Sequence, residues 1–145
     1  MSSKVEIRLA VLEDLAAICS TRSEIFDEKV DPNLTREFLK DPRHHLALAI
    51  VDGQIVGMAS AVDYIHPDKK PELFINEAGV DPSFQNQKIG RQLIEFLCGY
   101  GKTIGCISAW VLTEDDNVAA QKAYAAAGGI KSDEQIVMFE FEINK

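Results

Sequence analysis

Alternating and helical patterns of apolar residues divide the chain into short strands and helices. Near the start, KVEIRLAV alternates between apolar and polar residues, as half-buried strands do, and EDLAAICSTRSEIF then changes to a helical period. DPNLTREFLKDP is predicted to form a short second helix between Pro32 and Pro42, because proline is tolerated at helix starts and breaks helix interiors. The chain therefore opens as strand, helix, helix.

The middle of the chain predicts three consecutive antiparallel strands. HLALAIVDGQIVGMASAVDYI contains two strand-like runs joined by Asp52 and Gly53, a pair that favours a tight hairpin turn, and ELFINEAGV is expected to be the third strand. An amphipathic helix follows from about Lys88, and CISAWVL is expected to be a buried strand. NVAAQKAYAAAG predicts another helix, and IVMFEFEI a closing strand whose core face would carry Val137, Phe139, Phe141 and Ile143.

The predicted order is β-α-α-β-β-β-α-β-α-β-β, an α/β fold around one mixed, mostly antiparallel sheet in a single domain of residues 1–145. Strand, helix and strand through residues 73–112 form a crossover, so those two strands should be parallel. Ligands tend to bind at the carboxyl end of the first strand of such a unit. The stretch VDPSFQNQKIG occupies this position.

Composition narrows the classes of function. The 145 residues are 46% hydrophobic, enough for a sizeable core, and the formal net charge of −8 argues against a nucleic-acid partner and suits a cationic small molecule. Three cysteines, Cys19, Cys98 and Cys106, lack metal-ligand spacing and are expected to be buried free thiols. His44 and His45 have no partner motif, so we expect no metal site.

Neither a membrane segment nor a signal peptide is apparent. No apolar run approaches the roughly 20 residues needed to cross a bilayer, and MSSKVEIRLA lacks the apolar stretch of a signal peptide. We therefore expect a cytoplasmic protein without a membrane partner.

The loop before the long helix has the features of an anion site. A helix beginning near Lys88 would direct the free backbone amides of residues 87–91 at one point, which suits a phosphate or pyrophosphate. Gly90 would let the backbone approach the anion. Lys88 is expected to have an ordinary negative φ and to reach the phosphate from the side.

Three pieces of the sequence together resemble the acetyl-coenzyme A-binding core of the GNAT N-acetyltransferase family. The family pattern of arginine or glutamine, two variable residues, glycine, a variable residue, then glycine or alanine is similar to Gln85–Gly90, with Lys88 at the first glycine. A later helix of the family carries asparagine, alanine, tyrosine and glycine at spacings that match Asn117, Ala120, Tyr124 and Gly128. The element order agrees with the family fold over nearly the whole chain.

The resemblance implies an acetyl-coenzyme A site. Backbone groups in a strand bulge at Gly79 and Val80 would pair with the pantetheine arm, and Asn117 would also bind that arm or else simply cap its helix. The remaining contacts to the co-substrate are expected from Gln85, Gln87, Lys88, Ile89, Gly90 and Arg91.

Amine acetylation needs a base for the amine and an acid for the leaving thiolate. Tyr124 is our candidate acid, with packing against the sheet as the alternative role. Glu77 is the candidate base, and a plain solvent-facing position is equally compatible with the sequence. No cysteine has the surroundings of an acyl-accepting nucleophile, so direct transfer is expected.

Within the family, the chain looks most like the short aminoglycoside 3-N-acetyltransferases, which implies a polycationic acceptor. Glu114, Asp115 and Asp116 are candidate acceptor contacts or a solvated loop, and Glu140 and Glu142 could join an acidic rim. A polyamine, an amino acid derivative or a protein amine are alternative acceptors, and a non-catalytic coenzyme A-binding module is a further alternative. The apolar closing strand also favours a homodimer.

Overall fold

The computed structural model describes residues 4–144. It contains five strands, namely β1 (Glu6–Leu9), β2 (His44–Val51), β3 (Gln54–Tyr64), β4 (Glu72–Val80) and β5 (Ala109–Val111). Its helices are α1 (Leu15–Cys19), α2 (Pro32–Lys40), α3 (Ile89–Thr103) and α4 (Val118–Ala126). Two short 3-10 turns, η1 (Leu12–Asp14) and η2 (Pro82–Phe84), precede α1 and α3.

The strands form one open sheet in the order β1-β2-β3-β4-β5. The first four pair antiparallel, and β5 runs parallel to β4, as the predicted crossover requires. Asp52 (φ 50°) and Gly53 (φ 78°) make the β2–β3 turn, so the hairpin prediction is confirmed with positive φ at both central residues.

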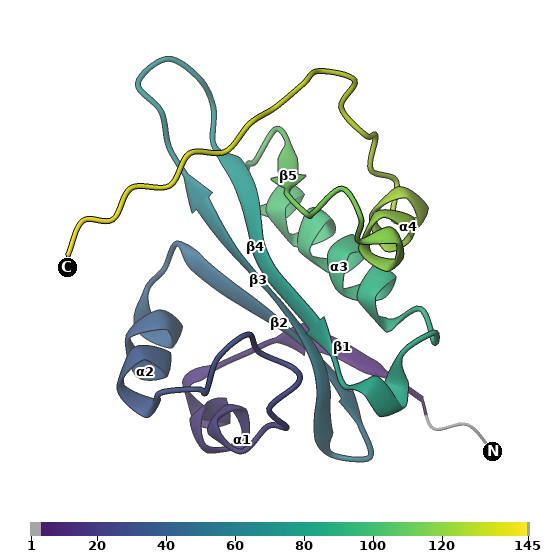
Figure 1. Ribbon diagram of the computed structural model, residues 1–145. Helices are drawn as coiled ribbons and strands as arrows, with labels where there is room; N and C mark the ends of the chain where they lie inside the picture. The colour runs from purple at the N-terminus through teal and green to yellow at the C-terminus, as the bar shows by residue number, and fades with distance from the viewer. Residues whose placement is uncertain (1–3, 145) are drawn as a thin grey trace.

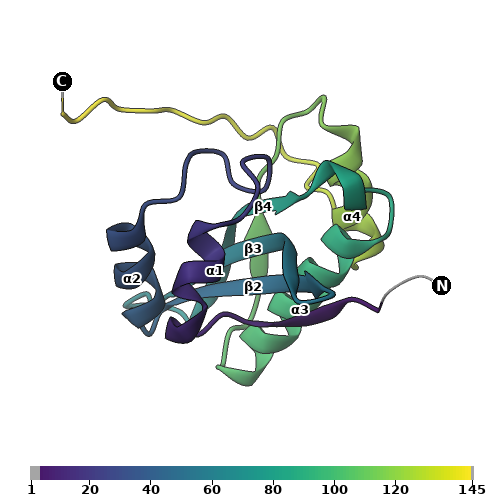
Figure 2. The same cartoon turned by 90° about the horizontal axis from the view of Figure 1, so that it is seen from below.

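Helices cover the two faces of the sheet unequally. Figure 1 shows α1 and α2 beside one face and α3 and α4 beside the other, and Figure 2 shows α1 lying across β2 and β3. On the α3 face the fully buried core includes Ala47, Ala59, Leu73, Ile75, Leu93 and Leu97. On the α1 face a smaller core is made of Ile18, Ile25, Leu46, Leu48 and Met58. The face of β4 and β5 opposite α3 therefore has less cover than the rest of the sheet.

Strand β4 is irregular in two ways: it contains a bulge, and it continues beyond the end of its pairing with β5. Ser60 pairs with Glu77 but Ala61 pairs with Ile75, so Asn76 is an extra residue in β4 and forms a bulge. Pairing between β4 and β5 ends at Ile75 and Val111. Beyond that point β4 continues to Val80 without β5 beside it. The bulge expected at Gly79 and Val80 was therefore misplaced, since these residues pair regularly with Met58 and Gly57.

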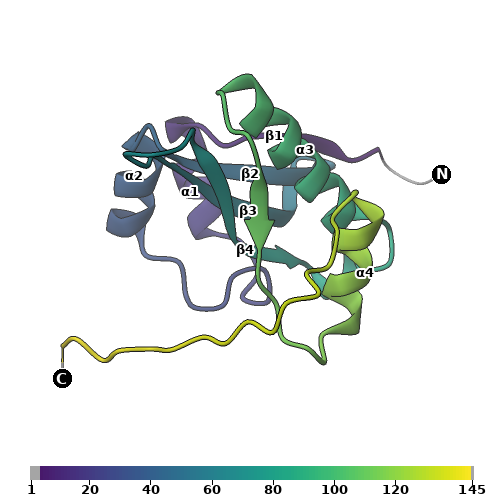
Figure 3. The same cartoon turned by 90° about the horizontal axis from the view of Figure 1, so that it is seen from above.

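The prediction of a closing strand at IVMFEFEI is wrong, because the structure has no strand there. Residues 128–144 contain no helix or strand, and the segment extends away from the body of the molecule (Figure 1, Figure 3). A strand needs a partner for its backbone groups, and none is provided here. The two final strands of the predicted order are thus absent from the described residues.

Two further elements are shorter than predicted. The first helix ends at Cys19, and the chain continues as an irregular loop in which Ile25 is still buried. β5 has three residues, of which Trp110 is 40% exposed, whereas a buried strand was expected.

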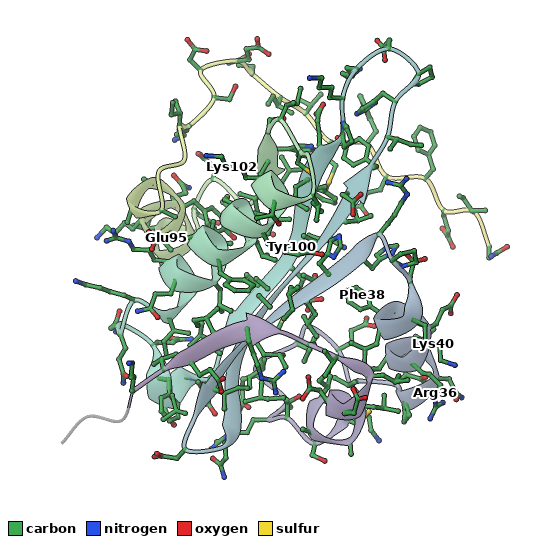
Figure 4. The ribbon with its side chains drawn as sticks, turned by 180° about the vertical axis from the view of Figure 1, so that it is seen from behind. Arg36, Phe38, Lys40, Glu95, Tyr100 and Lys102 are labelled. Carbon is green, nitrogen blue, oxygen red and sulfur yellow. The ribbon has the colours of Figure 1, made fainter. Side chains whose placement is uncertain are left out.

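The three cysteines are free, as expected, but they are not buried as expected. Cys98 is exposed, and Cys19 and Cys106 are partly exposed. His45 is buried and pairs with Asp63, and Tyr100, which projects from α3 toward the strands in Figure 4, contacts its ring edge-on. Among residues 4–144 no helix is long and apolar enough to span a membrane.

Candidate active site

An acidic cavity of about 490 Å³ lies between the loop after α1 and the strands β3 and β4. Phe26, Val30, Leu34 and Phe38 supply much of its apolar wall, and Ser60 and Asn76 line it from the strands. Its charged lining residues are four carboxylates and one ammonium, from Asp27, Glu28, Asp31, Glu77 and Lys29. Such a cavity favours a ligand with more than one positive charge.

Glu77 reaches this cavity because of the bulge. Leu73 and Ile75 point into the core under α3, and a regular two-residue period would send Glu77 to the same face. The extra residue Asn76 reverses the alternation, so Glu77 shares a face with its partner Ser60 and lines the cavity. The side chain therefore does not simply face solvent, which was the alternative to a catalytic role.

The environment of Glu77 suits a proton acceptor. Its Oε2 accepts a hydrogen bond from the backbone N–H of Asp27 at 2.7 Å. Burial raises the pKa of the Glu77 carboxyl above its ordinary value of 4.5, against the opposing effect of that hydrogen bond. A carboxylate with a raised pKa is a stronger base than one in water, and Glu77 lines the acidic cavity.

Sequence reasoning missed the acidic loop in SEIFDEKVDPNL. Asp27, Glu28 and Asp31 belong to it, and their spacing between two helices was the available signal. Asp31 also caps α2, since its Oδ1 accepts from the Leu34 N–H at 2.9 Å. The loop folds against β4 so closely that a Cβ at Gly79 would overlap the backbone oxygen of Ile25.

The predicted acidic run lies elsewhere. Glu114, Asp115 and Asp116 follow β5, are exposed, and do not line the acidic cavity. The backbone oxygens of Glu114 and Asp115 accept from the Gln121 side chain at 3.3 and 2.8 Å, which ties the run to α4. Their acceptor-binding role stays a prediction, and the structure offers the other loop as a better-placed acidic site.

Tyr124 projects from α4 into a second, larger cavity of about 890 Å³. Ile75 and Val111, the last paired residues of β4 and β5, line the same cavity, and Tyr124 also packs against the core that contains Ile75. Burial, and to a smaller extent the Glu114 carboxylate, raise the pKa of the Tyr124 phenol above 10. The phenol therefore stays protonated at neutral pH, as a proton donor must.

The start of α3 presents free backbone amides. The first helical bond runs from the Gln92 N–H to the Lys88 oxygen at 3.0 Å, and no side chain caps the helix. The N–H groups of Ile89, Gly90 and Arg91 thus have no partner within the helix. With the positive end of the helix dipole, these amides suit the binding of an anion, and their contact with the co-substrate stays a prediction.

Lys88 has a conformation that the sequence analysis did not expect. It is the N-cap of α3 in the left-handed region, with φ at 65°, and Asn86 has the same φ. The family glycine at this position would adopt that conformation without strain, so the expected negative φ was wrong. Gly90 faces α4, since an added Cβ would lie 4.0 Å from the Ala123 Cβ. That distance is an ordinary van der Waals contact, so helix packing does not itself require a glycine at this position.

Other predicted co-substrate residues have local partners. The Gln85 side chain donates to the Val80 oxygen at 3.3 Å, and Arg91 pairs with Glu95 at 3.1 Å. Gln87 is exposed in the loop before α3. Asn117 caps α4, accepting from the Ala120 N–H at 3.1 Å, so the capping role is confirmed and its amide nitrogen is left as a donor.

The free edge of β4 offers backbone groups to an extended ligand. Asp81 donates to Val56 across the β3–β4 ladder, so the alternation directs the backbone groups of Gly79 toward β3 and those of Ala78 and Val80 outward. These outward groups lie beyond the end of β5. They could bind a pantetheine arm as a neighbouring strand would, with Ala78 in place of the expected Gly79. Among residues 4–144 no group of three or more metal-ligating side chains is assembled.

Comparisons with known proteins identify the family of the chain. The pattern of the acetyltransferase (GNAT) family matches residues 10–128. The chain is 31% identical to an aminoglycoside N(6')-acetyltransferase type 1 of Salmonella typhimurium, over 66% of this chain and 69% of the relative. It is 29% identical to a protein of the same name from Stenotrophomonas maltophilia, over 99% and 97% of the two chains.

Solved structures share the fold. An aminoglycoside acetyltransferase from an uncultured soil metagenomic sample, in complex with sisomicin, superposes with a TM-score of 0.84 at 20% identity, covering 97% of each chain. The aminoglycoside N-acetyltransferase AAC(6')-Iy in complex with CoA gives a TM-score of 0.79 at 22% identity, covering 99% of this chain and 98% of that one. Family pattern and fold agree over nearly the same residues. The chain belongs to the acetyltransferase (GNAT) family and is an acyltransferase.

Proposed function

We propose that this enzyme transfers an acetyl group from acetyl-coenzyme A directly to a primary amine of an aminoglycoside, at the 6'-position. The observation that carries the proposal is the acidic cavity around Glu77, because it combines several carboxylates with a carboxyl of raised pKa. Relatives named N(6')-acetyltransferases support the acceptor class and the 6'-amine, in place of the 3-N position that the sequence suggested.

The acyl donor and the acceptor would bind at different parts of the fold. The amides of Ile89, Gly90 and Arg91 would hold the pyrophosphate, and the outward groups of Ala78 and Val80 would hold the pantetheine arm. The thioester would then reach the point where β4 and β5 separate. That point lies between the acidic cavity on one face of the sheet and Tyr124 on the other.

The chemistry follows from the two titratable groups. The amine nitrogen attacks the thioester carbon, a C–N bond forms, the C–S bond breaks, and the thiolate leaves. Glu77 takes the proton that the amine loses, directly or through water, and Tyr124 gives a proton to the thiolate. The free amine must be neutral to attack, so a nearby base is needed at neutral pH.

A pair of acceptors tests the position of transfer. We expect thiol release from acetyl-coenzyme A with an aminoglycoside that carries a 6'-amine, and none with a matched aminoglycoside that carries a 6'-hydroxyl. Mass spectrometry of the product should show one added acetyl group. Equal rates with both compounds would contradict the 6'-position, and reaction with a polyamine or a peptide amine in place of both would contradict the acceptor class.

A further inference from the structure

The segment that carries most of the charge of the acidic cavity has no regular structure of its own. Residues 20–31, which we call the acceptor loop, join α1 to α2 and contain neither helix nor strand. Most of the charged residues that line the acidic cavity belong to this loop. Figures 2 and 3 both show it beside β4. Its position therefore depends on contacts with its surroundings.

Two contacts hold the acceptor loop on β4. The Asp27 N–H donates to Glu77 Oε2 at 2.7 Å, and the Ile25 backbone oxygen lies where a Cβ at Gly79 would be. Gly79 has no positive φ, so the close approach of the loop is what requires a glycine there. Along these contacts the loop numbers fall as the strand numbers rise, so the loop runs antiparallel to β4.

Asp81, the residue after β4, supplies a third contact in the same direction. Arg22 Nε lies 3.3 Å from Asp81 Oδ2. The Asp81 side chain is only 4% exposed, whereas that of Arg22 is 65% exposed. A buried carboxylate without a cationic partner is costly. Arg22 is therefore attached to Asp81 more firmly than an ion pair on an open surface would be.

The other oxygen of Asp81 belongs to the donor side. Asp81 Oδ1 accepts from the Ser83 N–H at 2.9 Å, which fixes the start of η2. From η2 the chain leads to Lys88, the N-cap of α3, and to the amides proposed for the pyrophosphate. We call residues 81–88 the donor loop. One carboxylate thus contacts the acceptor loop through one oxygen and the donor loop through the other.

We propose that Arg22 and Asp81 are positioning residues that hold the acceptor loop in register with the donor loop. Gly79 has a part in the same arrangement, since a side chain there would push the loop away from β4. The proposal rests on the proposed function, because it takes the acidic cavity as the acceptor site. It assigns to Arg22 an effect on acceptor binding, although Arg22 does not line that cavity.

Hydrogen exchange of the ligand-free protein tests the positioning without any substrate. Arg22→Ala should speed exchange of the Asp27 amide by about two- to fivefold, as expected for loss of a partly exposed ion pair. Arg22→Lys keeps the charge and should restore part of the protection. The control Arg43→Ala removes a comparable arginine from Asp63, outside the acidic cavity, and should leave the Asp27 amide unchanged. Equal exchange in Arg22→Ala and wild type would overturn the proposal and leave the proposed function untouched.

Steady-state rates separate the two loops. Arg22→Ala should raise KM for a polycationic acceptor by about two- to fivefold. Its kcat and its KM for acetyl-coenzyme A should stay unchanged, because Asp81 Oδ1 still accepts from Ser83. Asp81→Ala removes both contacts and should raise KM for both substrates. An unchanged acceptor KM in Arg22→Ala, or an equal rise of both KM values, would contradict the positioning role.

A pair of glycine variants tests the close approach of the loop to β4. Gly79→Ala should raise the acceptor KM more than Arg22→Ala does, because its methyl group would overlap the Ile25 oxygen. The matched control Gly99→Ala adds a methyl group in open space on α3 and should change neither KM. An acceptor KM that is equal in Gly79→Ala and wild type would overturn the proposal. A wild type that acetylates no aminoglycoside would refute the proposed function instead, and the exchange of the Asp27 amide would still decide the position of the loop.

Discussion

Replacing Glu77 by glutamine should separate the chemistry of the site from its architecture. In the wild type the Asp27 N–H donates to Glu77 Oε2 at 2.7 Å. Glutamine has nearly the same shape and keeps an oxygen that can accept this hydrogen bond. It cannot accept a proton at neutral pH. A positioned base contributes about 10²–10⁴-fold, which corresponds to about 2.7–5.4 kcal/mol of transition-state stabilisation. We expect kcat to fall within that range, with the affinity for acetyl-coenzyme A unchanged.

The same substitution should not weaken the fold. Burial raises the pKa of Glu77, so the folded protein binds this proton more tightly than the unfolded chain does. The contribution of Glu77 to the free energy of unfolding is therefore complete below the pKa of this carboxyl in the unfolded chain. It is lost as the pH rises through the pKa of the same carboxyl in the folded protein. Glutamine resembles the neutral acid, so at pH 7 the melting temperature of Glu77→Gln should equal or slightly exceed that of the wild type.

Three measurements check this reasoning together. Steady-state rates give kcat, a thermal melt gives stability, and the pH profile of kcat/KM should lose its acid limb, which in the wild type lies above pH 4.5 because the pKa is raised. Glu72→Gln makes the same change on the same strand outside the acidic cavity and should leave kcat unaltered. If Glu77→Gln keeps kcat within about threefold of wild type, the loss is too small for a base and the assignment is wrong.

The other predictions concern the acid, the phosphate loop and the acceptor. Tyr124→Phe should lower kcat at least roughly tenfold while leaving coenzyme A affinity intact; calorimetry and steady-state rates check it, and an unchanged kcat would remove the phenol from the mechanism. Lys88→Gly relieves a left-handed backbone worth about 1–2 kcal/mol, offset by about 0.5–1 kcal/mol of glycine entropy, so the melting temperature should hold or rise slightly. Coenzyme A binding should weaken only a few-fold, less so at high salt, and complete loss of binding would contradict the backbone amides as the main anchor. Asp27→Asn with Glu28→Gln should raise KM for a polycationic acceptor more than for acetyl-coenzyme A, and a larger effect from Asp115→Asn would restore the acidic run as the acceptor site.

Local signals in the sequence predicted most elements because their causes are local. The Asp52-Gly53 turn is determined by the need for positive φ at two residues, and α3 by apolar residues recurring on one helical face. The first helix failed because Ile25 is buried without being helical: an irregular loop that packs on β4 can supply a core residue at a helical spacing. Periodicity reports burial, and burial does not require regular structure.

The closing strand was predicted wrongly because its formation depends on a partner that is distant in the sequence. The alternation from Val137 to Ile143 is typical of a strand. A strand forms only when another strand edge pairs with it, and the segment itself does not determine that partner. The site shows the same limit. Candidate residues Glu77 and Tyr124 could be predicted from family spacing, whereas the acidic loop around Asp27 reaches Glu77 only through the three-dimensional path of the chain. Two segments that are distant in the sequence and close in space leave no periodic pattern in the sequence that would reveal their contact.

Strand β4 explains why one extra residue has so large an effect on function. Without Asn76 the two-residue period would bury the Glu77 carboxylate under α3 among Leu93 and Leu97, where a charge is costly and no acceptor can reach it. With the bulge, Glu77 lines the acidic cavity, and the same strand continues past the end of β5. Its outward backbone groups there have no neighbouring strand, although the Val80 oxygen accepts from the Gln85 side chain. In the proposed mechanism, the base and the backbone contacts to the pantetheine arm therefore come from neighbouring residues of one strand, so their relative position does not depend on any loop.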